Sequence, residues 1–350
     1  MGRIATNFNK GKNMKKLICV LLAGVFAVAM FAGCSFSPAS NVKIEGNGES
    51  VVSDGKFVYC IYRIGKANEP YSSQIRRLAV DNLGGESELI YDGIAYNLNL
   101  SEDGRIFFST EDGISWIKPG DEYKIDLIKL EQFDRSVVLN GDWIYFRVNA
   151  EDGDYSMGIY RINVDSYSVE TVLNAEVAGD FSNFRVVGDA IYYEVYSSKR
   201  FGLMKFDVLG GTKLLVTENE EYEHGTSGSY VTDKHIYISW SRPAVIKRFD
   251  LYGQNAEVIF AENEAQDSKC WVEFADAEFV YYSTEDGYYR IKADGTGQSE
   301  KIPPGHDGYW NSRVFVAGKL FVHSYKENDD RGEEEIYCVD RDGKNSFRLK

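Results

Sequence analysis

The sequence predicts an all-β protein built from repeats, and the repeats predict a β-propeller. Aromatic residues make up 14% of the chain, led by 24 Tyr and 20 Phe, while only 6 residues are Pro. Such side chains suit pleated, half-buried strands. The chain has 350 residues, more than one ordinary hydrophobic core organises. A turn followed by a strand, as in "VVGDAIYYEV" at 186–195, also recurs along it.

Six further stretches repeat this pattern: "SDGKFVYCIY", "EDGRIFFST", "NGDWIYFRV", "TDKHIYISW", "ADAEFVYYST" and "AGKLFVHSY". Aligned on the third residue of the apolar run, the seven copies lie 37 to 49 residues apart, about 44 on average. The aligned positions are Tyr59, Phe108, Tyr145, Tyr192, Tyr237, Tyr281 and Val322. Periods of roughly 40 to 50 residues are typical of propeller blades.

Each repeat contains enough strands for one blade. A second piece, such as "GIYRINVDSYS" or "VIKRFDLYG", ends in an Asp/Asn/Gly turn, and another apolar piece, such as "SVETVLNA" or "AEVIFAEN", follows it. A single four-stranded sheet cannot bury both faces, whereas seven packed around an axis can. We therefore predict a seven-bladed propeller over 43–350, with six or eight blades as alternatives.

The seam of the predicted ring involves both ends of the repeat region. The last blade takes its four strands from the C-terminal part, ending in "SFRLK", and "VKIEG" at 42–46 could add a strand at the seam. Cys60 and Cys338 fall in the first and last blades. They are interpreted as buried thiols or, alternatively, as a disulfide across the seam, which would stabilise by about 2–4 kcal/mol.

The N-terminus predicts export. After Met14, two lysines precede an apolar run over 17–32 and the sequence Ala-Gly-Cys ending at Cys34. The run is shorter than the roughly 20 residues that a membrane span needs. The segment resembles the lipobox of bacterial lipoproteins, although Phe31 stands where that motif usually has Leu. The resemblance implies a signal peptide over 1–33 with its true start at Met14.

The same resemblance assigns an acyl anchor to Cys34, such as palmitate, and a short tether over 34–42. It implies that the mature protein lies outside the cytoplasm, in the cell envelope, held to the membrane by its lipid. Cleavage before Cys34 removes five of the 39 basic residues and none of the 54 acidic ones, so the formal charge changes from −15 to −20. Such a surface disfavours nucleic acid as a partner.

The repeats themselves resemble a known family. "DGxIYY"-like and "IYRIxxDG"-like pieces are similar to the YWTD-type propeller repeats of lipoprotein-receptor ectodomains, and to related bacterial propeller repeats of a domain of unknown function. The resemblance covers nearly all of the mature chain and implies the propeller architecture. The YWTD tetrapeptide is absent, so the ligand binding of the receptor family is not carried over.

Signatures of catalysis are weak. None of the four histidines pairs with another at metal-ligand spacing on one element. "HGTSGS" at 224–229 lacks the G-x-S-x-G spacing of a serine elbow. "KADGTG" and "DRDGKN" carry incomplete calcium-loop patterns, and we interpret Asp342 and Gly343 as turn residues. The sequence therefore predicts no catalytic residue, metal or cofactor.

A basic residue recurs in the third strand of five repeats. Repetition favours a structural role, such as pairing with acids of the neighbouring blade or covering apolar surface with long stems, and a ring that binds anions is the alternative. The five residues are Arg77, Arg161, Lys205, Arg248 and Arg290.

The loops that join one blade to the next carry aromatic residues beside acids and amides. Such groups suit sugars, peptides or cations, although the aromatics could instead cap the blade cores. The candidate ligand-binding residues are Tyr96, Tyr222, His224, Trp271, His306, Tyr309 and Trp310.

Three functions fit these features. The sequence favours a monomeric, membrane-anchored propeller that binds a protein, a peptide or an envelope glycan without catalysis. One alternative is a structural partner in the assembly of a membrane complex. Another is a propeller enzyme, a lyase or hydrolase, that uses His306 or His224 with nearby carboxylates.

Overall fold

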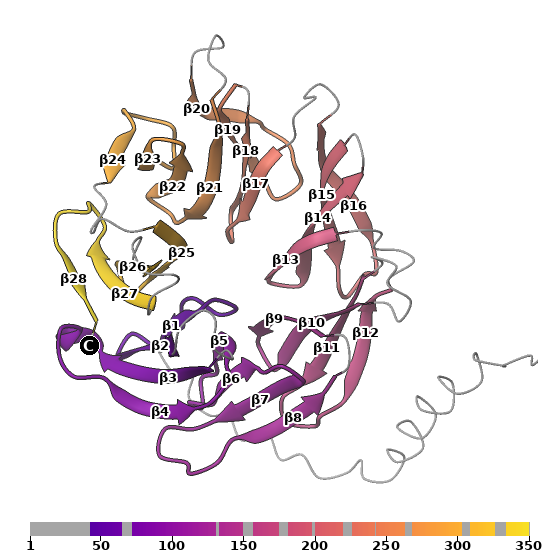
Figure 1. Ribbon diagram of the computed structural model, residues 1–350. Coiled ribbons are helices and arrows are strands. Elements are labelled where there is room, and N and C mark those ends of the chain that lie inside the picture. Colours follow the sequence, from indigo (N-terminus) through magenta and orange to yellow (C-terminus); the bar gives the residue numbers. More distant parts are fainter. Residues whose placement is uncertain are drawn as a thin grey trace, which may run out of the picture. The chain divides into compact units, whose positions relative to one another are not determined.

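The strands that the structure describes form seven four-stranded antiparallel sheets arranged in a ring (Figure 1). The prediction of a seven-bladed propeller is confirmed. The structure is a computed structural model and describes residues 43–349 except 65–71, 131–132, 150–156, 175–180, 198–199, 220–225, 242, 263–267, 303–308 and 326–333. The predicted signal peptide and Cys34 lie outside these residues. No helix among the described residues has the length and apolar character that crossing a membrane requires.

Each blade uses four strands that follow one another in the chain, the first nearest the axis and the fourth outermost. The strands of blades 1 to 4 are β1 Val51–Ser53, β2 Phe57–Ile64, β3 Ser72–Ala79 and β4 Glu88–Asp92; β5 Tyr96–Leu100, β6 Ile106–Ser109, β7 Gly113–Ile117 and β8 Ile125–Lys129; β9 Phe133–Asn140, β10 Trp143–Asn149, β11 Met157–Asn163 and β12 Val169–Leu173; β13 Phe181–Val187, β14 Ala190–Ser197, β15 Arg200–Asp207 and β16 Lys213–Asn219.

Blades 5 to 7 follow the same plan. Their strands are β17 Thr226–Val231, β18 His235–Trp240, β19 Val245–Asp250 and β20 Glu257–Ala261; β21 Cys270–Ala275, β22 Phe279–Thr284, β23 Gly287–Lys292 and β24 Glu300–Ile302; β25 Tyr309–Val316, β26 Lys319–Tyr325, β27 Glu334–Asp340 and β28 Ser346–Arg348. A short 3₁₀ turn, Val80–Asn82, lies between β3 and β4.

The core lies between the blades, and the alternation of each second strand explains why. In β2, Tyr59 and Ile61 pack with side chains of blade 2, whereas Val58 and Cys60 pack with side chains of blade 7. Successive side chains of a strand point to opposite faces, so one strand fills two interfaces. All seven positions on which the repeats align are buried, as the repeat predicts.

The ring closes by apolar packing between blades 1 and 7. We call this the seam cluster; it joins Val51, Val58, Cys60, Leu78 and Leu83 to Val314, Val316, Phe321, Ile336, Cys338 and Leu349. The last blade takes all four strands from the C-terminal part of the chain, as expected. Because no strand of blade 7 comes from the N-terminus, side-chain packing carries much of the closure.

The disulfide interpretation of the seam is wrong. Cys60 and Cys338 both lie in the seam cluster as free, buried thiols. Burial raises the pKa of the Cys338 thiol to about 12, which keeps it protonated near neutral pH. The interface between blades 1 and 7 has room for small apolar side chains, and the two cysteines pack there as small apolar residues.

The segment before β1 adds single bridges at the seam rather than a full strand. Glu45 pairs with Ser53 through two backbone hydrogen bonds of 2.9 Å. The Glu45 side chain accepts a hydrogen bond from the backbone N–H of Ala317, in the β25–β26 turn, at 2.7 Å. The described part of this segment, 43–46, therefore links blade 1 to blade 7 without extending either sheet.

Hairpin turns follow the Asp-Gly signals of the sequence. The turn after β27 has Gly343 at a φ of 74° and a hydrogen bond of 2.8 Å from Gly343 N to Asp340 O. This is the turn expected for Asp342 and Gly343. Gly253 at a φ of 76° also approaches the outer strand of blade 4 so closely that a Cβ would lie 1.9 Å from the carbonyl oxygen of Val216. No other residue type fits there without backbone movement.

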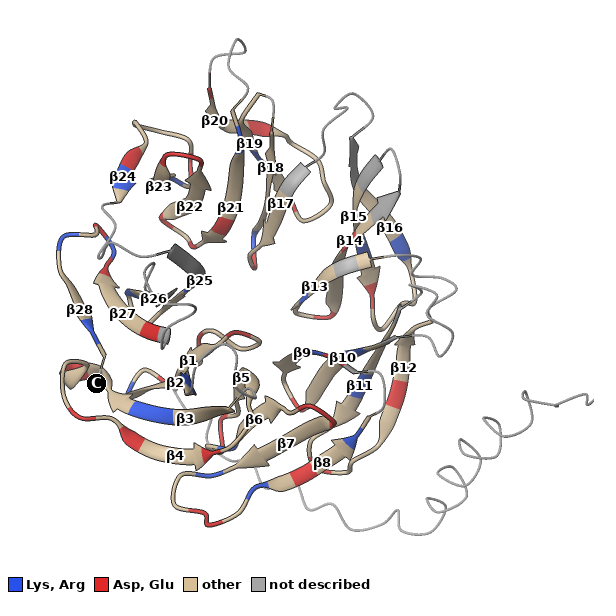
Figure 2. Ribbon diagram, in the orientation of Figure 1, with Lys and Arg blue, Asp and Glu red and all other residues tan. Residues whose placement is uncertain are grey.

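The recurring basic residues have a structural role, and the acids that pair with four of the five belong to the same blade. Arg290 contacts Glu300 of the neighbouring outer strand at 2.6 Å and lies over the Phe279 ring, 4.5 Å from its centroid. Its Nη1 also donates to the carbonyl of Arg341, in blade 7, at 2.9 Å. Arg77, Arg161 and Arg248 likewise pair with Glu88, Glu170 and Glu257. Figure 2 shows basic β3 and β11 beside acidic β4 and β12.

These basic residues occur where the buried position opposite them is a tyrosine. Tyr59, Tyr145, Tyr192, Tyr237 and Tyr281 are the register partners of Arg77, Arg161, Lys205, Arg248 and Arg290. In the other two blades, Phe108 faces Ser115 and Val322 faces Tyr337. A buried phenol needs a polar neighbour, whereas Phe and Val do not. The tyrosine and the basic residue therefore recur together.

Replacing Arg290 by methionine should lower the free energy of unfolding by about 1–2 kcal/mol. The change keeps the apolar stem and removes the charged hydrogen bonds to Glu300 and to the carbonyl of Arg341, and such bonds contribute about 1.5–3 kcal/mol, less where solvent screens them. Urea unfolding measures the loss. Exposed Lys292→Met in the same strand is the control, and an equal effect of both changes would contradict the structural role.

Candidate functional site

The innermost strands of the blades line the centre of the ring, and most of them carry a β-bulge. In β5 the pairing with β6 shifts between Tyr96 and Leu98, and in β13 the pairing with β14 shifts between Phe181 and Phe184. The pairing register shifts in the same way in four further innermost strands, β9, β17, β21 and β25. A bulge re-aims side chains, and bulges are common beside functional sites. At the first two shifts the bulges supply Asn97 and Asn183.

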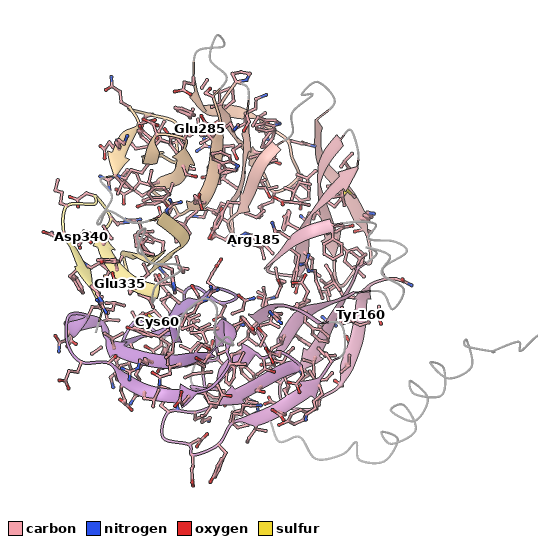
Figure 3. The ribbon with its side chains drawn as sticks, in the orientation of Figure 1. Cys60, Tyr160, Arg185, Glu285, Glu335 and Asp340 are labelled. Carbon is pink, nitrogen blue, oxygen red and sulfur yellow. The ribbon has the colours of Figure 1, made fainter. Side chains whose placement is uncertain are left out.

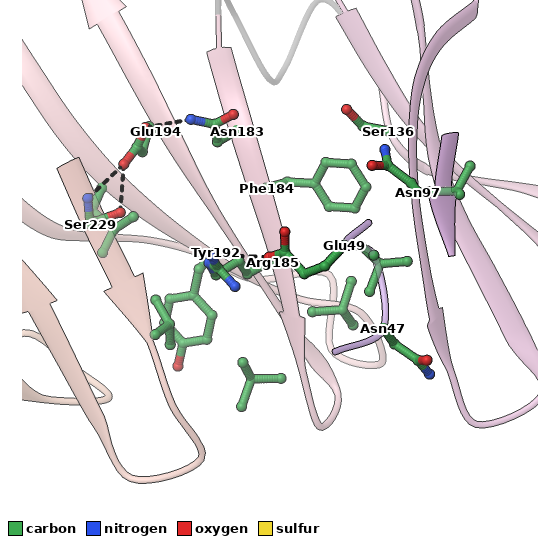
Figure 4. Close-up of a pocket in the computed structure, with 17 residues that line it drawn as sticks. Asn47, Glu49, Asn97, Ser136, Asn183, Phe184, Arg185, Tyr192, Glu194 and Ser229 are labelled. Carbon is green, nitrogen blue, oxygen red and sulfur yellow. Dashed lines mark hydrogen bonds and ion pairs between the residues drawn. The ribbon is translucent and has the colours of Figure 1, made fainter. Parts of the chain in front are cut away.

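A pocket of about 390 Å³ lies in the central channel, on the side of blades 2 to 5 (Figure 4). The apolar part of the lining of this central pocket includes Val137, Val138 and Phe184. Its polar lining consists of Asn47, Glu49, Asn97, Ser136, Asn183, Arg185, Glu194 and Ser229. The lining is more polar than apolar, and a concave site of this size where several polar groups converge is a candidate site for a small molecule or a short peptide segment.

Glu49 reaches the central pocket because its backbone is held against blade 2. The N–H of Gly48 donates to the carbonyl of Leu98 at 2.9 Å, and the N–H of Leu98 donates to the carbonyl of Glu49 at 2.6 Å. Gly48 has a φ of 89°, and a Cβ there would lie 3.0 Å from Val138. Glycine thus allows the segment to pass close to β9 and to place Glu49 in the channel.

Glu49 faces Arg185 across the central pocket at a distance of 3.9 Å, between Oε1 and Nη2 (Figure 4). Both side chains remain partly exposed, 40% for Glu49 and 37% for Arg185. Burial within the channel raises the pKa of Glu49, and the positive charge of Arg185 lowers it by less. A carboxyl with a raised pKa, open to a pocket, can take up and release a proton at a higher pH than an ordinary Glu.

Arg185 is held in place by blade 5. Its guanidinium lies over the Tyr230 ring, 4.0 Å from the centroid, and Tyr230 packs edge-on against Phe274 at 5.2 Å. This stacking fixes the planar group while its other side faces the pocket. Arg185 therefore offers positive charge and hydrogen-bond donors to a bound carbonyl or carboxylate.

The other acids near the axis have closer partners than Glu49. Glu194 is buried and accepts hydrogen bonds from Ser229 Oγ at 2.6 Å, Ser229 N at 3.0 Å and Asn183 Nδ2 at 3.3 Å. On β21, Glu273 contacts Arg313 at 3.0 Å, and on β9, Asp134 contacts Arg147. These pairs join neighbouring strands and blades. Glu49 is thus the channel carboxylate best placed to act on a ligand.

Two of the residues predicted to bind a ligand have described side chains, and these lie away from the central pocket. Tyr96 begins β5 and lies under the guanidinium of Arg135, 4.5 Å from its ring centroid, and Trp271 is half-buried in β21. Neither lines the central pocket. Tyr309 and Trp310 begin β25. Tyr222, His224 and His306 lie outside the described residues, so ligand binding by the seven residues stays a prediction.

Sequence reasoning missed Glu49 and Arg185. Glu49 belongs to the short segment "EGNGES" before the first strand, which the pattern of repeats leaves out. Its signal is the pair Gly46 and Gly48, which predicts a close backbone approach. Arg185 alternates with apolar residues in an ordinary strand pattern and carries no such signal.

The described residues contain no cluster of three or more His, Cys, Asp or Glu side chains that could hold a metal ion. No protein-family profile matches the chain, and no curated protein matches it in sequence. Solved structures do match its fold. They include a puromycin hydrolase at 11% identity, with a TM-score of 0.62 over 87% of this chain and 53% of the other.

Two further peptidases have a similar propeller. A Mycobacterium tuberculosis puromycin-hydrolyzing peptidase matches at 11% identity, with a TM-score of 0.60 over 88% of this chain and 53% of its own. A Pyrococcus horikoshii acylaminoacyl peptidase matches at 13% identity, with a TM-score of 0.59 over 88% of this chain and 52% of its own. This chain thus spans about half the length of these structures, and at such identities the likeness establishes the fold.

These similarities contradict the interpretation of a propeller that binds without catalysis. Several of the solved structures that resemble this ring are peptidases, and the alternative of a propeller hydrolase agrees better with them. The interpretation of binding without catalysis was wrong because the repeats consist mainly of packing residues. Glu49 precedes the repeats, and Arg185 fits an ordinary strand pattern, so neither suggested a reaction.

Proposed function

We propose that this chain is a hydrolase that acts on amide bonds of peptides in its central pocket. The observation that carries the proposal is Glu49, a pocket carboxyl with a raised pKa, facing the arginine Arg185 at 3.9 Å. The likeness to puromycin-hydrolyzing and acylaminoacyl peptidases supports the substrate class. It remains an argument from fold, because similar folds host different activities.

Glu49 and Arg185 can take different roles in the hydrolysis of an amide bond. Glu49, as the carboxylate, takes a proton from a water molecule whose oxygen attacks the amide carbon. Arg185 stabilises the negative charge that develops on the carbonyl oxygen. Glu49 then returns the proton to the nitrogen as the C–N bond breaks, which leaves a carboxylic acid and an amine, and the acid then loses its proton to solvent or to the amine.

The remaining lining suits a peptide. Asn97 and Asn183 place amide groups at two bulges along the central pocket, and side-chain amides can donate and accept hydrogen bonds with a peptide backbone. Asn97 Nδ2 donates to the carbonyl of Arg135 at 2.9 Å, which fixes its orientation. Val137, Val138 and Phe184 offer apolar contact to a side chain.

The experiment that tests the proposal incubates the purified chain with puromycin and with a panel of aminoacyl and peptidyl p-nitroanilides. Release of the amine product, dependent on Glu49, is the expected result. A chain that releases no product above the level of its Glu49→Gln variant on any member of the panel contradicts the proposal.

We also propose that Cys34 carries a lipid anchor, on the strength of the lipobox-like sequence before it. The mature protein should begin at Cys34 and carry acyl chains, because two or more chains hold a protein firmly to a bilayer. Mass spectrometry of the N-terminal peptide checks this. A membrane-free protein that retains residues 14–33 contradicts it.

A further inference from the structure

A second pocket lies between blades 5 and 6, away from the central pocket. It has a volume of about 440 Å³ and is lined by Phe260, Glu262, Tyr282, Glu285, Asp286 and Tyr289, together with Ser268, Lys269, Thr284 and Ser299. We call it the blade 5–6 pocket. Its residues come from the ends of β20 and β22 and from β23, and Figure 3 labels Glu285 at this part of the ring.

Three aromatic rings form a rigid part of this wall. Phe260 and Tyr282 have ring centroids 4.8 Å apart, and Tyr282 stacks on Tyr289 at 5.6 Å with an interplanar angle of 19°. The Tyr282 hydroxyl donates to Ser299 Oγ at 2.6 Å, so a hydrogen bond as well as packing holds the central ring. Electron-rich ring faces attract cations.

The acids around the rings differ in their partners. Glu285 pairs with Lys269 at 2.9 Å, and Asp286 pairs with Lys301 at 3.2 Å and accepts a hydrogen bond from the Tyr289 hydroxyl at 2.7 Å. Hydrogen bonds, the strongest from Thr284, lower the pKa of Asp286 to about 2, so it stays ionised. The Glu262 carboxylate makes no ion pair or hydrogen bond with any described residue, while its backbone N–H donates to Ala244 O at 3.0 Å.

The pocket is thus negative and aromatic. Its lining holds three carboxylates against one lysine. Lys301 already places its ammonium over Tyr289, 5.4 Å from the ring centroid. An anion would be repelled, and a bare divalent cation would gain little from the aromatic part of the wall. An organic cation uses both features, since its ammonium groups can pair with Glu262 while its methylene groups contact Phe260 and Tyr289.

We propose that the blade 5–6 pocket binds a small organic polycation with primary ammonium groups, of the polyamine class. Glu262 supplies the charge that a ligand can pair with, and Phe260 and Tyr289, on either side of the buried Tyr282 ring, supply apolar contacts. The site is separate from the central pocket and does not depend on the hydrolase proposal.

Titration calorimetry with spermidine as the probe, at about 0.15 M salt, tests the site. We expect one spermidine per chain, at least tenfold weaker binding to Glu262→Gln, and weaker binding to Tyr289→Leu. The control is Glu111→Gln, which removes one charge from an exposed position in blade 2 and should bind as the unchanged protein does. Thermal unfolding of each variant establishes that it is folded.

Three outcomes would overturn the proposal: no measurable binding of spermidine, equal binding by the Glu262→Gln variant, or an equal loss with Glu111→Gln. The last would mean that spermidine associates with the net negative charge of the chain and not with this pocket. Competition by Mg²⁺ at equal concentration would point to the same conclusion, because a polyamine held by rings and carboxylate should not be displaced so easily.

Discussion

Replacing Phe321 by alanine is expected to lower the free energy of unfolding by about 3–5 kcal/mol. Phe321 has no exposed surface and packs in the seam cluster between blades 7 and 1. Truncating a buried Phe loses its transfer free energy and leaves a cavity. Because packing closes the ring, this loss should approach that of Phe107→Ala, which removes an equally buried ring between blades 2 and 3. Urea unfolding monitored by tyrosine and tryptophan fluorescence measures both.

The matched control is Phe347→Ala in β28 of the same blade. Phe347 is 37% exposed, so its truncation should cost far less than that of Phe321. If Phe321→Ala costs as little as Phe347→Ala while Phe107→Ala is costly, blades 1 and 7 do not pack as the structure has them. The three variants together separate closure of the ring from the stability of a single blade.

Replacing Glu49 by glutamine should reduce amide hydrolysis by about 10²–10⁴-fold, the usual contribution of general acid–base catalysis. Glutamine keeps the size of the side chain and removes the proton transfer. The ratio kcat/KM on the best substrate of the p-nitroanilide panel measures the effect. Glu86→Gln, at an exposed position of blade 1, removes the same charge and should leave the rate unchanged. A Glu49→Gln variant as fast as Glu86→Gln would refute the assignment.

The pH dependence provides a second readout for Glu49. Its pKa in the folded chain is raised by burial, so the carboxylate needed as a base forms at higher pH than an ordinary Glu would allow. The rate should therefore rise with pH through this raised pKa. Stability should change in the opposite direction: between the unfolded and the folded pKa the folded state binds more protons, so unfolding becomes easier as pH rises. Glu49→Gln should remove both dependences.

The architecture could be predicted from the sequence because its causes are local. Strands, turns and buried faces follow from alternation, from Asp-Gly signals and from aromatic residues such as Tyr145 and Tyr281. The seven copies of the repeat then predict seven blades, with six or eight left as alternatives until the structure is known. The third-strand basic residues were also visible, although the sequence suggested acids of the neighbouring blade as their partners. The register between neighbouring strands decides which acid each basic residue contacts. Arg290, for example, pairs with Glu300 of the adjacent strand.

The candidate sites could not be predicted in the same way. Glu49 precedes the first strand, and Arg185 lies in blade 4; only the ring brings them to 3.9 Å. Likewise, Glu262 joins Tyr282 and Tyr289 only where blades 5 and 6 meet. The sequence alone determined the seven blades, since strand patterns depend on neighbouring residues. The tertiary structure decided the seam, the free thiols and both pockets, because each depends on which distant side chains become neighbours when the ring closes.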